Sequence, residues 1–405
     1  MNSSYISEHK YKTWAEIDLS ALRHNFNQIR GFVKERTPDC RVICVVKADA
    51  YGHGAPECAF TLYREGADFF AVSSIGEAAE LRDTMVIADG ETAPDILILG
   101  YTPPENADIL IKYNITQTVI SPEYAKLLDA SIREYKENGI IPADDTLSVH
   151  IKIDSGMNRL GFDSLSPNCA DDVATVTEYE SLKVKGIFSH FAASDEIPGR
   201  GEEVCRAQYA KFLSVMYILK SRGIEFECVH ICNSAATLNC PELHLDAVRV
   251  GIMLYGLPPE RAHSDRTSEY LNLKPVMKLR SVVSHIHTVH KGESVSYGGD
   301  YTAGRDIKAA TIPIGYADGF IRLLSKGGGG MIRGKFAPVL GRICMDQCIL
   351  DVTDIAAETG DTVTFFGDTP EQIEKLAEIA GTINYELICI VNKRVKRLYS
   401  AGESV

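Results

Sequence analysis

The sequence predicts an α/β fold, a (β/α)₈ TIM-type barrel followed by a mostly β C-terminal domain. Between residues 41 and 254, eight short apolar, β-branched runs alternate with stretches of helical periodicity. After about residue 258 the runs become short and often alternating, and Gly-rich turns separate them, which is typical of antiparallel β structure. A chain of 405 residues is long enough for a barrel and one smaller unit.

The elements follow the chain in order. Residues 13–36 combine a strand-like start, an Asp or Ser N-cap candidate and an amphipathic helix, and their strand need not belong to the barrel. Helical patterns separate the eight apolar runs, with apolar positions three or four apart. The runs are 41–47, 69–74, 96–100, 116–121, 149–154, 184–190, 226–233 and 245–254. Eight βα units predict a closed barrel.

Two domains follow from this division. We expect the barrel to span residues 15–257 and the β domain to span 258–405, together with the N-terminal strand near 11–17. Within the second domain, residues 370–381 return to helical spacing and predict a helix.

The composition is that of a globular protein with a sizeable core, since 45% of the residues are hydrophobic and 24% are charged. A net charge of -13 repels phosphate backbones and anionic membranes, so neither nucleic acid nor membrane is an expected partner. The polar start at residues 1–12 lacks the apolar core of a signal peptide, and no run approaches the roughly 20 apolar residues of a membrane span. These features predict a cytoplasmic protein.

The cysteines are expected to be reduced thiols packed in the core, because several fall inside apolar, strand-like runs. These are Cys44, Cys228, Cys232, Cys344 and Cys389. No pair has the Cys-x-x-Cys spacing of a zinc ribbon. His285 and His287 share one strand face near His290, but no neighbouring Cys or carboxylate completes a ligand set. We therefore expect no metal site.

Two stretches that contain glycines could be mistaken for functional motifs. Residues 329–335 mimic the first seven positions of a phosphate-binding P-loop, but Phe336 replaces the required Ser or Thr and Pro338 argues against a following helix. We interpret this stretch as a loop of the β domain. His53, between two glycines, is expected to be structural in a tight turn.

Reactive side chains recur where the expected barrel strands end, which is where the active sites of such barrels lie. Lys47 ends the first strand, Arg159 follows the fifth, His190 ends the sixth, Asn233 and Ser234 end the seventh, and Arg249 lies in the eighth, just before Gly251 and Ile252. These positions converge on one mouth of the barrel.

The chemistry of these residues suggests a cofactor. A lysine is costly to bury as a cation, so Lys47 is expected to be paired, neutral or covalently bonded, and a neutral lysine forms Schiff bases with carbonyls. Asn233, Ser234 and the backbone at Gly251 and Ile252 supply donors of the kind that hold a phosphate. An aldehyde that carries a phosphate, pyridoxal 5'-phosphate, satisfies both requirements.

A resemblance covers nearly the whole chain. "VVKADAYGHG" at residues 45–54 is similar to the cofactor-lysine motif of the bacterial alanine racemases, which are fold-type III pyridoxal-phosphate enzymes. Further similar motifs follow in order: AEIDLSALRHNF, KIDSGMNRLGF, SHFAASDE, NSAAT, VRVGIMLYGL, VSYGGDYTA, IGYADGF, GRICMDQ and INYEL with KRVKR. The resemblance implies a barrel with a β domain, and a head-to-tail homodimer whose active sites use residues of both chains.

The resemblance also implies catalytic roles. Lys47 would hold the cofactor as an internal aldimine and then serve as the base on the D-face, while Tyr297 from the partner subunit would be the base on the L-face. Racemisation removes a proton on one face and delivers one on the other, so two opposed bases suit it. A phenol titrates near ~10, so Tyr297 needs positive surroundings, which the relay of His190 and Arg249 would supply.

Arg249 would face the pyridine nitrogen of the cofactor. A guanidinium does not readily give up its proton, so the ring nitrogen would stay unprotonated and the cofactor would be a weaker electron sink. Side reactions such as transamination would then be limited, which suits racemisation.

Further roles are implied for other residues. Arg159 would bind the phenolic oxygen of the cofactor and the substrate carboxylate. The backbone of the partner's Met345, with its neighbours Cys344 and Asp346, would lie beside it. Lys152 matches a lysine that is often carbamylated in the family. The cofactor-binding set is Lys47, Tyr51, Arg159, His190, Asn233, Ser234, Arg249, Gly251, Ile252 and Lys393. The entryway set is Asp195, Tyr316, Arg322 and Arg342.

Two positions depart from the family pattern. Asp49 stands where many relatives have Asn, and an ungapped alignment puts Lys393 where a tyrosine often sits, near the phosphate and the inner gate. Lys393 would alter the shape and charge around the substrate side chain, so strict alanine specificity is in question.

The function that these features favour is an amino-acid racemase acting on alanine, which would supply D-alanine for peptidoglycan. A serine or broader-specificity racemase of the same family is the alternative. A basic amino-acid decarboxylase of the same fold type is disfavoured, because it usually presents a carboxylate to the ring nitrogen, where Arg249 is expected. A non-catalytic protein of pyridoxal-phosphate homeostasis is disfavoured because such proteins lack the second domain, which here carries Tyr297 and Met345.

Overall fold

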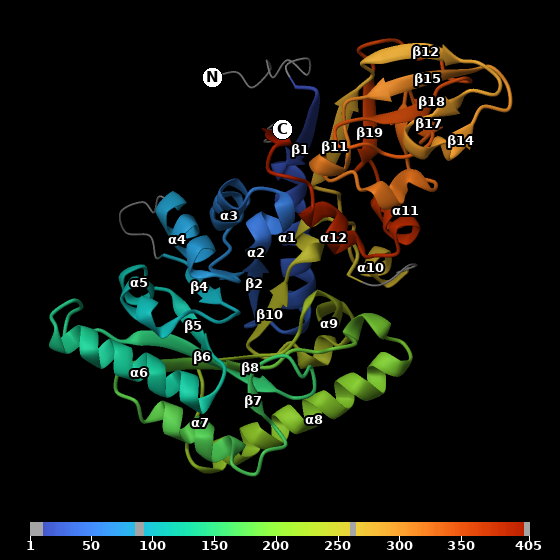
Figure 1. Ribbon diagram of the computed structural model, residues 1–405. Helices are drawn as coiled ribbons and strands as arrows, with labels where there is room; N and C mark the ends of the chain where they lie inside the picture. Colours follow the sequence, from blue (N-terminus) through green and yellow to red (C-terminus); the bar gives the residue numbers. More distant parts are fainter. Residues whose placement is uncertain (1–10, 86–92, 260–264, 401–405) are drawn as a thin grey trace.

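The computed structural model describes residues 11–85, 93–259 and 265–400, and Figure 1 shows a barrel that carries a β-rich unit at one end. The polar residues 1–10, expected to lack a signal peptide, lie outside the described residues. Eight parallel strands follow one another in the order β5-β4-β3-β2-β10-β9-β8-β6, and pairing of β5 with β6 closes the barrel. The predicted fold class is therefore confirmed.

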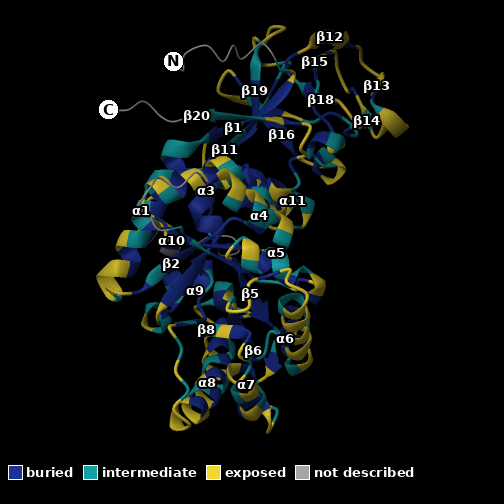
Figure 2. Cartoon of the chain, turned by 90° about the vertical axis from the view of Figure 1, so that its left-hand side faces the viewer, coloured by how far each residue is buried: buried dark blue, intermediate teal, exposed yellow. Residues whose placement is uncertain are grey.

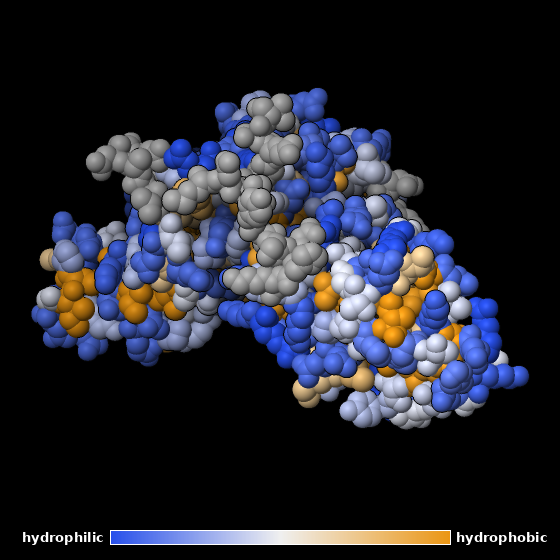
Figure 3. Space-filling model, turned by 90° about the horizontal axis from the view of Figure 1, so that it is seen from above, coloured by the Kyte–Doolittle hydropathy of each residue, from blue (hydrophilic) through white to orange (hydrophobic). Residues whose placement is uncertain are grey.

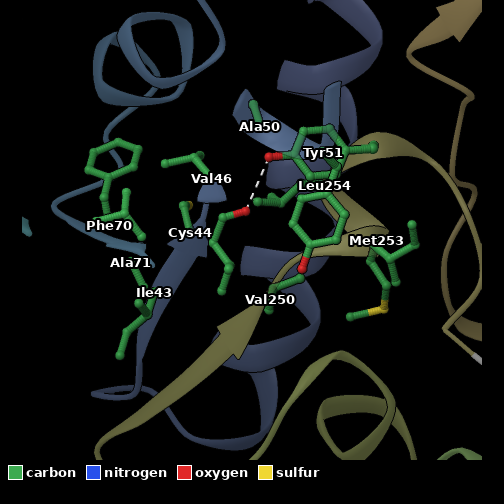
Figure 4. Packing of buried hydrophobic residues seen from close by; sticks show 14 of the residues in the cluster. Ile43, Cys44, Val46, Ala50, Tyr51, Phe70, Ala71, Val250, Met253 and Leu254 are labelled. Carbon is green, nitrogen blue, oxygen red and sulfur yellow. Dashed lines mark hydrogen bonds between the residues drawn. The ribbon is translucent and has the colours of Figure 1, made fainter. Parts of the chain in front are cut away.

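Each of the eight apolar runs contributes one barrel strand. The strands are β2 (Arg41–Val45), β3 (Phe69–Val72), β4 (Asp95–Ile98), β5 (Thr116–Val119), β6 (Leu147–Asp154), β8 (Leu182–Phe188), β9 (Cys228–His230) and β10 (Ala247–Val250). A two-residue strand, β7 (Phe162–Asp163), pairs in parallel with the end of β6. Apolar residues of β2, β3, β10 and the segment after β10 pack together in the core, as Figure 4 shows for Cys44, Phe70, Val250 and Met253.

Helices cover the barrel with their apolar faces inward. They are α1 (Leu19–Arg36), α3 (Ala55–Arg64), α4 (Ile75–Thr84), α5 (Ala107–Lys112), α6 (Pro122–Glu137), α7 (Cys169–Thr177), α8 (Arg200–Ser221), α9 (Ser234–Asn239) and α10 (Asp265–Tyr270). In α1 the side chain of Asp18 accepts the backbone N–H groups of Ser20 and Ala21, so Asp18 is the N-cap. Figure 2 shows exposed outer faces and buried inner faces on α6 and α8.

The described residues of the C-terminal unit form three sheets. A six-stranded sheet has the order β17-β16-β19-β11-β1-β20, β12-β15-β18 form a second sheet, and β13-β14 form a hairpin. The strands are β1 (Thr13–Asp18), β11 (Met277–Val282), β12 (His285–Val289), β13 (Ser294–Val295), β14 (Tyr301–Thr302), β15 (Ile307–Ile312), β16 (Gly329–Ile332), β17 (Lys335–Pro338), β18 (Cys348–Asp351), β19 (Thr362–Phe366) and β20 (Lys396–Ser400). The N-terminal strand β1 thus pairs with β11 and β20, outside the barrel.

The glycine-rich residues 329–335 were expected to form a loop, and that expectation is wrong. They build the hairpin of β16 and β17, which turns at Arg333 and Gly334 with φ of 49° and 76°. A Cβ on Gly330 would lie 2.5 Å from Cγ1 of Val363, so the glycine allows β16 to approach β19 closely. Glycine is therefore required here both for the turn at Gly334 and for the close packing of the strand at Gly330.

Two of the cysteines that were expected to be packed in the core are not fully buried. All eleven cysteines lie within the described ranges as free thiols and nine are buried, but Cys344 is half-buried and Cys389 is exposed. Cys389 ends the short helix α12 (Asn384–Cys389), which follows α11 (Pro370–Ala380). Its apolar neighbours Leu387 and Ile388 face the core, and the helical turn directs Cys389 away from it.

Within the described residues, no helix is both long and apolar enough to cross a bilayer. Figure 3 shows a mostly hydrophilic face on which apolar residues form separate patches. The same residues contain no group of three or more His, Cys, Asp or Glu side chains placed to hold a metal ion. His285 and His287 stack on each other with ring centroids 5.2 Å apart.

Candidate active site

A cavity of about 940 Å³ opens at the carboxyl ends of the barrel strands and is closed on one side by α11 and α12. Side chains from several βα junctions line it together. Among the residues singled out in the sequence, the lining contains Lys47, Tyr51, His190, Asp195, Asn233, Ser234, Arg249 and Gly251. The structure therefore gathers eight of the predicted residues at one site.

Lys47 lies two residues beyond β2 and begins α2 (Lys47–Gly52). From Ala48 to Tyr51 the φ angles are 52° to 56°, so this segment is a left-handed turn. Burial is the main cause that lowers the pKa of Lys47, and the nearby Arg159 charge lowers it further, while Glu77 opposes the shift. The neutral amine, which is the nucleophilic form, is thereby favoured.

Tyr51, Ser234 and Gly251 form the polar end of the cavity. The N–H of Gly251 donates to Oγ of Ser234 over 2.9 Å. A Cβ at position 251 would lie 2.3 Å from Oη of Tyr51, so only glycine lets this hydroxyl approach the backbone. Ile252, directly after, is fully buried. Hydroxyl and N–H groups that converge in this way fit the oxygens of a phosphate.

Asn233, which precedes α9, braces the same corner. Its Oδ1 accepts the N–H of Ala236 at 2.9 Å and the hydroxyl of Ser194 at 2.8 Å. Ser194 belongs to the loop that also carries Asp195, so Asn233 ties the loop after β8 to the start of α9. The sequence placed Asn233 and Ser234 at the end of the seventh strand, whereas β9 ends three residues earlier, at His230.

Arg249 is only 3% exposed and lies at the centre of a buried hydrogen-bond network. Its guanidinium donates to the carbonyls of Ser189 at 2.8 Å and Ile231 at 3.0 Å. It also contacts Nδ1 of His190 at 3.0 Å and Nδ1 of His230 at 2.5 Å. Burial lowers the pKa of Arg249 to about 10, which still leaves the group cationic near neutral pH.

The two histidines beside Arg249 are neutral. Burial, and then the Arg249 charge, lower the pKa of both His190 and His230 well below the usual value. His230 continues the network, because its Nε2 lies 3.0 Å from Nδ1 of the buried His150. His150 and His230 were not singled out in the sequence; the signal was their place on barrel strands, with His150 two residues before Lys152 and so on the same side of the strand.

Lys152 and Arg159 lie close to this network. Lys152 is 3% exposed, its Nζ donates to the carbonyl of Ile153 at 2.7 Å, and burial lowers its pKa to about 7, with Arg249 adding to the shift. Arg159 is exposed, and its backbone N–H donates to Asp154 at 2.9 Å. Among the described residues Arg159 is not part of the cavity lining, although its charge acts on Lys47.

The residues predicted in the C-terminal unit cluster with one another, outside the cavity lining that the described part of this chain forms. They are Tyr297, Tyr316, Arg322, Arg342, Cys344, Met345 and Asp346. Tyr297 is 72% exposed and Met345 is 53% exposed. The N–H of Tyr316 donates to the carbonyl of Cys344 at 3.0 Å, and Arg342 pairs with Asp300 over 2.8 Å. A single chain thus presents these side chains on its own surface.

Tyr385 in α12 is a lining residue that the sequence patterns did not assign. Its ring centroid lies 6.1 Å from that of Tyr51, at the polar end of the cavity. Lys393, expected near the phosphate, is exposed in the segment between α12 and β20 and is outside the lining formed by the described residues. The role expected of Lys393 at the cofactor stays a prediction, while the structure places Tyr385, from the motif INYEL, in the cavity lining.

Comparison with known proteins gives a consistent result. The family model "Alanine racemase, N-terminal domain" matches residues 17–259 and "Alanine racemase, C-terminal domain" matches residues 276–399. Alanine racemase 1 of Clostridium acetobutylicum is 42% identical over 395 residues, which cover 96% of each chain.

Solved structures agree with this finding. Alanine racemase of Clostridium difficile 630 in complex with cycloserine has a TM-score of 0.83 at 38% identity and covers 96% of both chains. Alanine racemase of Bacillus anthracis with bound L-Ala-P has a TM-score of 0.84 at 32% identity, covering 97% of this chain and 96% of that one.

Proposed function

The chain belongs to the alanine racemase family, and we propose that it interconverts L- and D-alanine with pyridoxal 5'-phosphate bound at Lys47. The observation that carries the proposal is the shared cavity of Lys47, Arg249 and the Tyr51–Ser234–Gly251 corner. A lysine with a lowered pKa, a cation and a set of phosphate donors meet there, which are the groups that this cofactor requires. The relatives complexed with cycloserine and L-Ala-P are consistent with an amino-acid-sized substrate.

The residues present fit the cofactor. Pyridoxal phosphate, when bound, supplies an aldehyde that condenses with an amine and a conjugated ring that withdraws electrons from the α-carbon of an amino acid. Lys47 is the residue that would hold the cofactor covalently, with loss of water, because its neutral amine is nucleophilic. Ser234, Gly251 and Tyr51 would hold the phosphate, with Ile252 and Asn233 supporting the same corner.

Lys47 and Tyr297 would exchange protons with the α-carbon from opposite faces. Lys47 lies in the cavity of its own chain, whereas Tyr297 is exposed on the C-terminal unit. A second copy of the chain would bring the partner subunit's Tyr297 and Met345 to the cavity, so the working unit is a homodimer. The positive charge of Arg249 would lower the cost of ionising that phenol.

Arg249 would set the electronic character of the site. Its pKa of about 10 keeps the guanidinium protonated near neutral pH, so it has no proton to spare for a ring nitrogen. By leaving the ring nitrogen unprotonated, Arg249 would favour return of the proton to the α-carbon over transfer of the amino group. A decarboxylase of this fold type would place a carboxylate there, and Arg249 would take that position instead.

Alanine is the proposed substrate, and supply of D-alanine for peptidoglycan is the proposed role. The case for a broader specificity rested on Lys393, and the described geometry keeps Lys393 out of the lining while Tyr385 enters it. A tyrosine ring beside Tyr51 leaves room for a small side chain and presents no charge to a larger polar one.

The test is a racemisation assay on the purified protein. With added pyridoxal phosphate, L-alanine should lose its optical rotation and take up solvent deuterium at the α-carbon, faster than L-serine or L-lysine does. Lys47→Ala should abolish the reaction. Release of CO₂ without racemisation, or full activity of the Lys47→Ala protein, would overturn the proposal.

A further inference from the structure

The turn that carries Lys47 adopts a backbone conformation that its residues disfavour. Ala48, Asp49, Ala50 and Tyr51 all have φ between 52° and 56°, the left-handed region, and none is a glycine. For a residue with a Cβ, this conformation is less stable than the right-handed one. Four in succession persist only where contacts from outside the turn stabilise them.

The barrel side of this turn is held by Glu77 of α4. One carboxylate oxygen of Glu77 accepts the N–H of Ala48 at 2.8 Å. The other oxygen accepts the N–H of Ser73 at 2.7 Å and its hydroxyl at 2.9 Å, just after β3. The N–H of Ala48 belongs to the peptide group that joins it to Lys47. Glu77 therefore fastens the backbone of Lys47 to the end of the neighbouring barrel strand.

The far side of the turn is held by Arg397 of β20, in the C-terminal unit. Its Nε donates to the carbonyl of Gly52, the last residue of α2, at 3.0 Å. Its other nitrogens donate to the carbonyls of Val391 and Asn392, each at 2.6 Å, and of Val395 at 2.8 Å. The same guanidinium thus joins the lysine turn to the segment between α12 and β20.

Two close approaches support this second attachment. A Cβ on Gly52 would lie 2.6 Å from the carbonyl oxygen of Ile388 in α12. A Cβ on Gly54 would lie 1.9 Å from Oη of Tyr399 in β20. The turn is therefore packed directly against two elements of the C-terminal unit, and both glycines are required for that contact.

We propose that Glu77 and Arg397 are positioning residues, which hold the left-handed turn from two domains and so direct the amine of Lys47 into the cavity. The chemical consequence rests on the proposed function, because it concerns how Lys47 reaches pyridoxal phosphate. Glu77 would act in addition through its charge, since it is the one carboxylate among the groups whose charges shift the pKa of Lys47.

A simpler role for Glu77 is to cap α4, because Ser74 and Glu77 have the spacing of a capping box. A capping box would have the carboxylate of Glu77 accept the N–H of Ser74, whereas its two oxygens accept the N–H groups of Ser73 and Ala48, so capping does not account for the contact with Ala48. The two roles are separable. A capping residue affects the start of α4, whereas a positioning residue affects the exchange of the Ala48 amide and the reactivity of Lys47.

The first experiment needs no cofactor. Hydrogen exchange in the full-length protein should show a protected Ala48 amide, and Glu77→Gln should speed its exchange roughly 10-fold or more, the change expected for loss of one charge-assisted hydrogen bond. Glutamine offers a single acceptor oxygen and cannot serve Ala48 and Ser73 together. Glu80→Gln, an exposed change on the same helix, is the matched control. Unchanged exchange at Ala48 in Glu77→Gln would overturn the proposal.

The second experiment measures Lys47 itself. In Glu77→Gln and Arg397→Lys, borohydride trapping of pyridoxal phosphate on Lys47 should be slower by roughly 10-fold, and kcat should fall by a similar factor while KM for alanine changes little. The pH at which the absorbance of the bound cofactor changes should move in Glu77→Gln, which removes a charge, and should move less in Arg397→Lys, which keeps one. Lys396→Gln, on the adjacent exposed position, is the control.

The outcomes separate the two proposals. If the wild type is not trapped at Lys47, the proposed function fails, and the exchange experiment alone decides the role of Glu77. If the wild type is trapped but both variants match it in trapping rate and kcat, the positioning role fails. Thermal unfolding verifies that each variant is folded, and if Glu77→Gln does not fold, Arg397→Lys carries the same test.

Discussion

Arg249 determines which nitrogen of each neighbouring histidine carries a proton. A guanidinium can only donate, so Nδ1 of His190 and Nδ1 of His230 must both accept. The proton of neutral His230 is then on Nε2, where it is donated to Nδ1 of His150. A directed chain of three residues therefore runs from the cavity into the barrel core, and its direction follows from a single cation.

Tyr297 should be needed for proton exchange but not for cofactor binding. Its hydroxyl is the only group that Tyr297→Phe removes, so kcat should fall by about 10²–10⁴-fold, the usual contribution of one acid–base group. Trapping of pyridoxal phosphate at Lys47 should be unchanged, because Tyr297 is not among the groups proposed to hold the phosphate or to react with the aldehyde. Tyr217→Phe, an exposed change on α8, is the control. Turnover that survives in Tyr297→Phe would assign the second base to another residue.

Lys152 should make stability depend on pH. Its pKa falls from 10.5 to about 7 on folding, mainly through burial, so between these values the unfolded chain binds more protons than the folded one. The free energy of unfolding should therefore rise with pH in this window, by up to about 1.4 kcal/mol per pH unit.

Denaturant unfolding at two pH values within this window measures the slope. Lys152→Met should remove this part of the slope, whereas Lys183→Met, a change of an exposed lysine on β8, should not. Equal slopes in the wild type and Lys152→Met would mean that Lys152 does not titrate there, as a carbamylated lysine would not.

At the scale of elements, the sequence predicted the barrel strands well because a buried parallel strand needs a continuous apolar run. Glycine was the less reliable signal. It indicated a loop at residues 329–335, where close packing of β16 on β19 required it. The left-handed turn at 48–51 had no local signal, since its conformation depends on Glu77 and Arg397, which are distant in the sequence.

The residues of the candidate site were likewise predicted only where their positions do not depend on contacts distant in the sequence. Strand ends indicated Lys47, His190 and Arg249, because their positions depend on the barrel alone. Tyr385 was not indicated, because its place at the cavity depends on how α12 docks on α2, a contact between segments more than 300 residues apart. Alternation along single strands likewise does not tell which histidines meet across the barrel.

The junction between β10 and the following turn should be sensitive to a single methyl group. In Gly251→Ala the new Cβ would lie 2.3 Å from Oη of Tyr51, so the hydroxyl or the backbone must move. We expect the affinity for pyridoxal phosphate to fall by roughly 10-fold or more, the change expected when one hydrogen bond to a charged phosphate is lost.

Gly31→Ala is the matched control, because nothing lies within 4 Å of its added Cβ in α1. It should leave the affinity unchanged and stabilise the protein by about 0.5–1 kcal/mol. An absorbance titration with the cofactor, combined with thermal unfolding, measures both quantities. Unchanged affinity in Gly251→Ala would remove this corner from the phosphate site.

At the scale of the whole molecule, the C-terminal unit has two different faces. One face carries Arg397 and α12, which contact the lysine turn of the same chain. The other presents Tyr297 and Met345, both more than half exposed. If the second face enters the cavity of a partner, each C-terminal unit supports one active site and completes another.

Mixed dimers should reveal whether Tyr297 acts on its own chain or on a partner. Lys47→Ala and Tyr297→Phe should each be inactive alone. After the two are unfolded and refolded together, half of the dimers should be mixed. In each mixed dimer one cavity keeps Lys47 from the Tyr297→Phe chain and receives intact Tyr297 from the Lys47→Ala chain. The mixture should therefore recover about a quarter of the wild-type activity per chain, because one site in two is complete in half of the dimers. Activity no higher than the sum of the parents would mean that Tyr297 serves the cavity of its own chain, and the shared site would have to be abandoned.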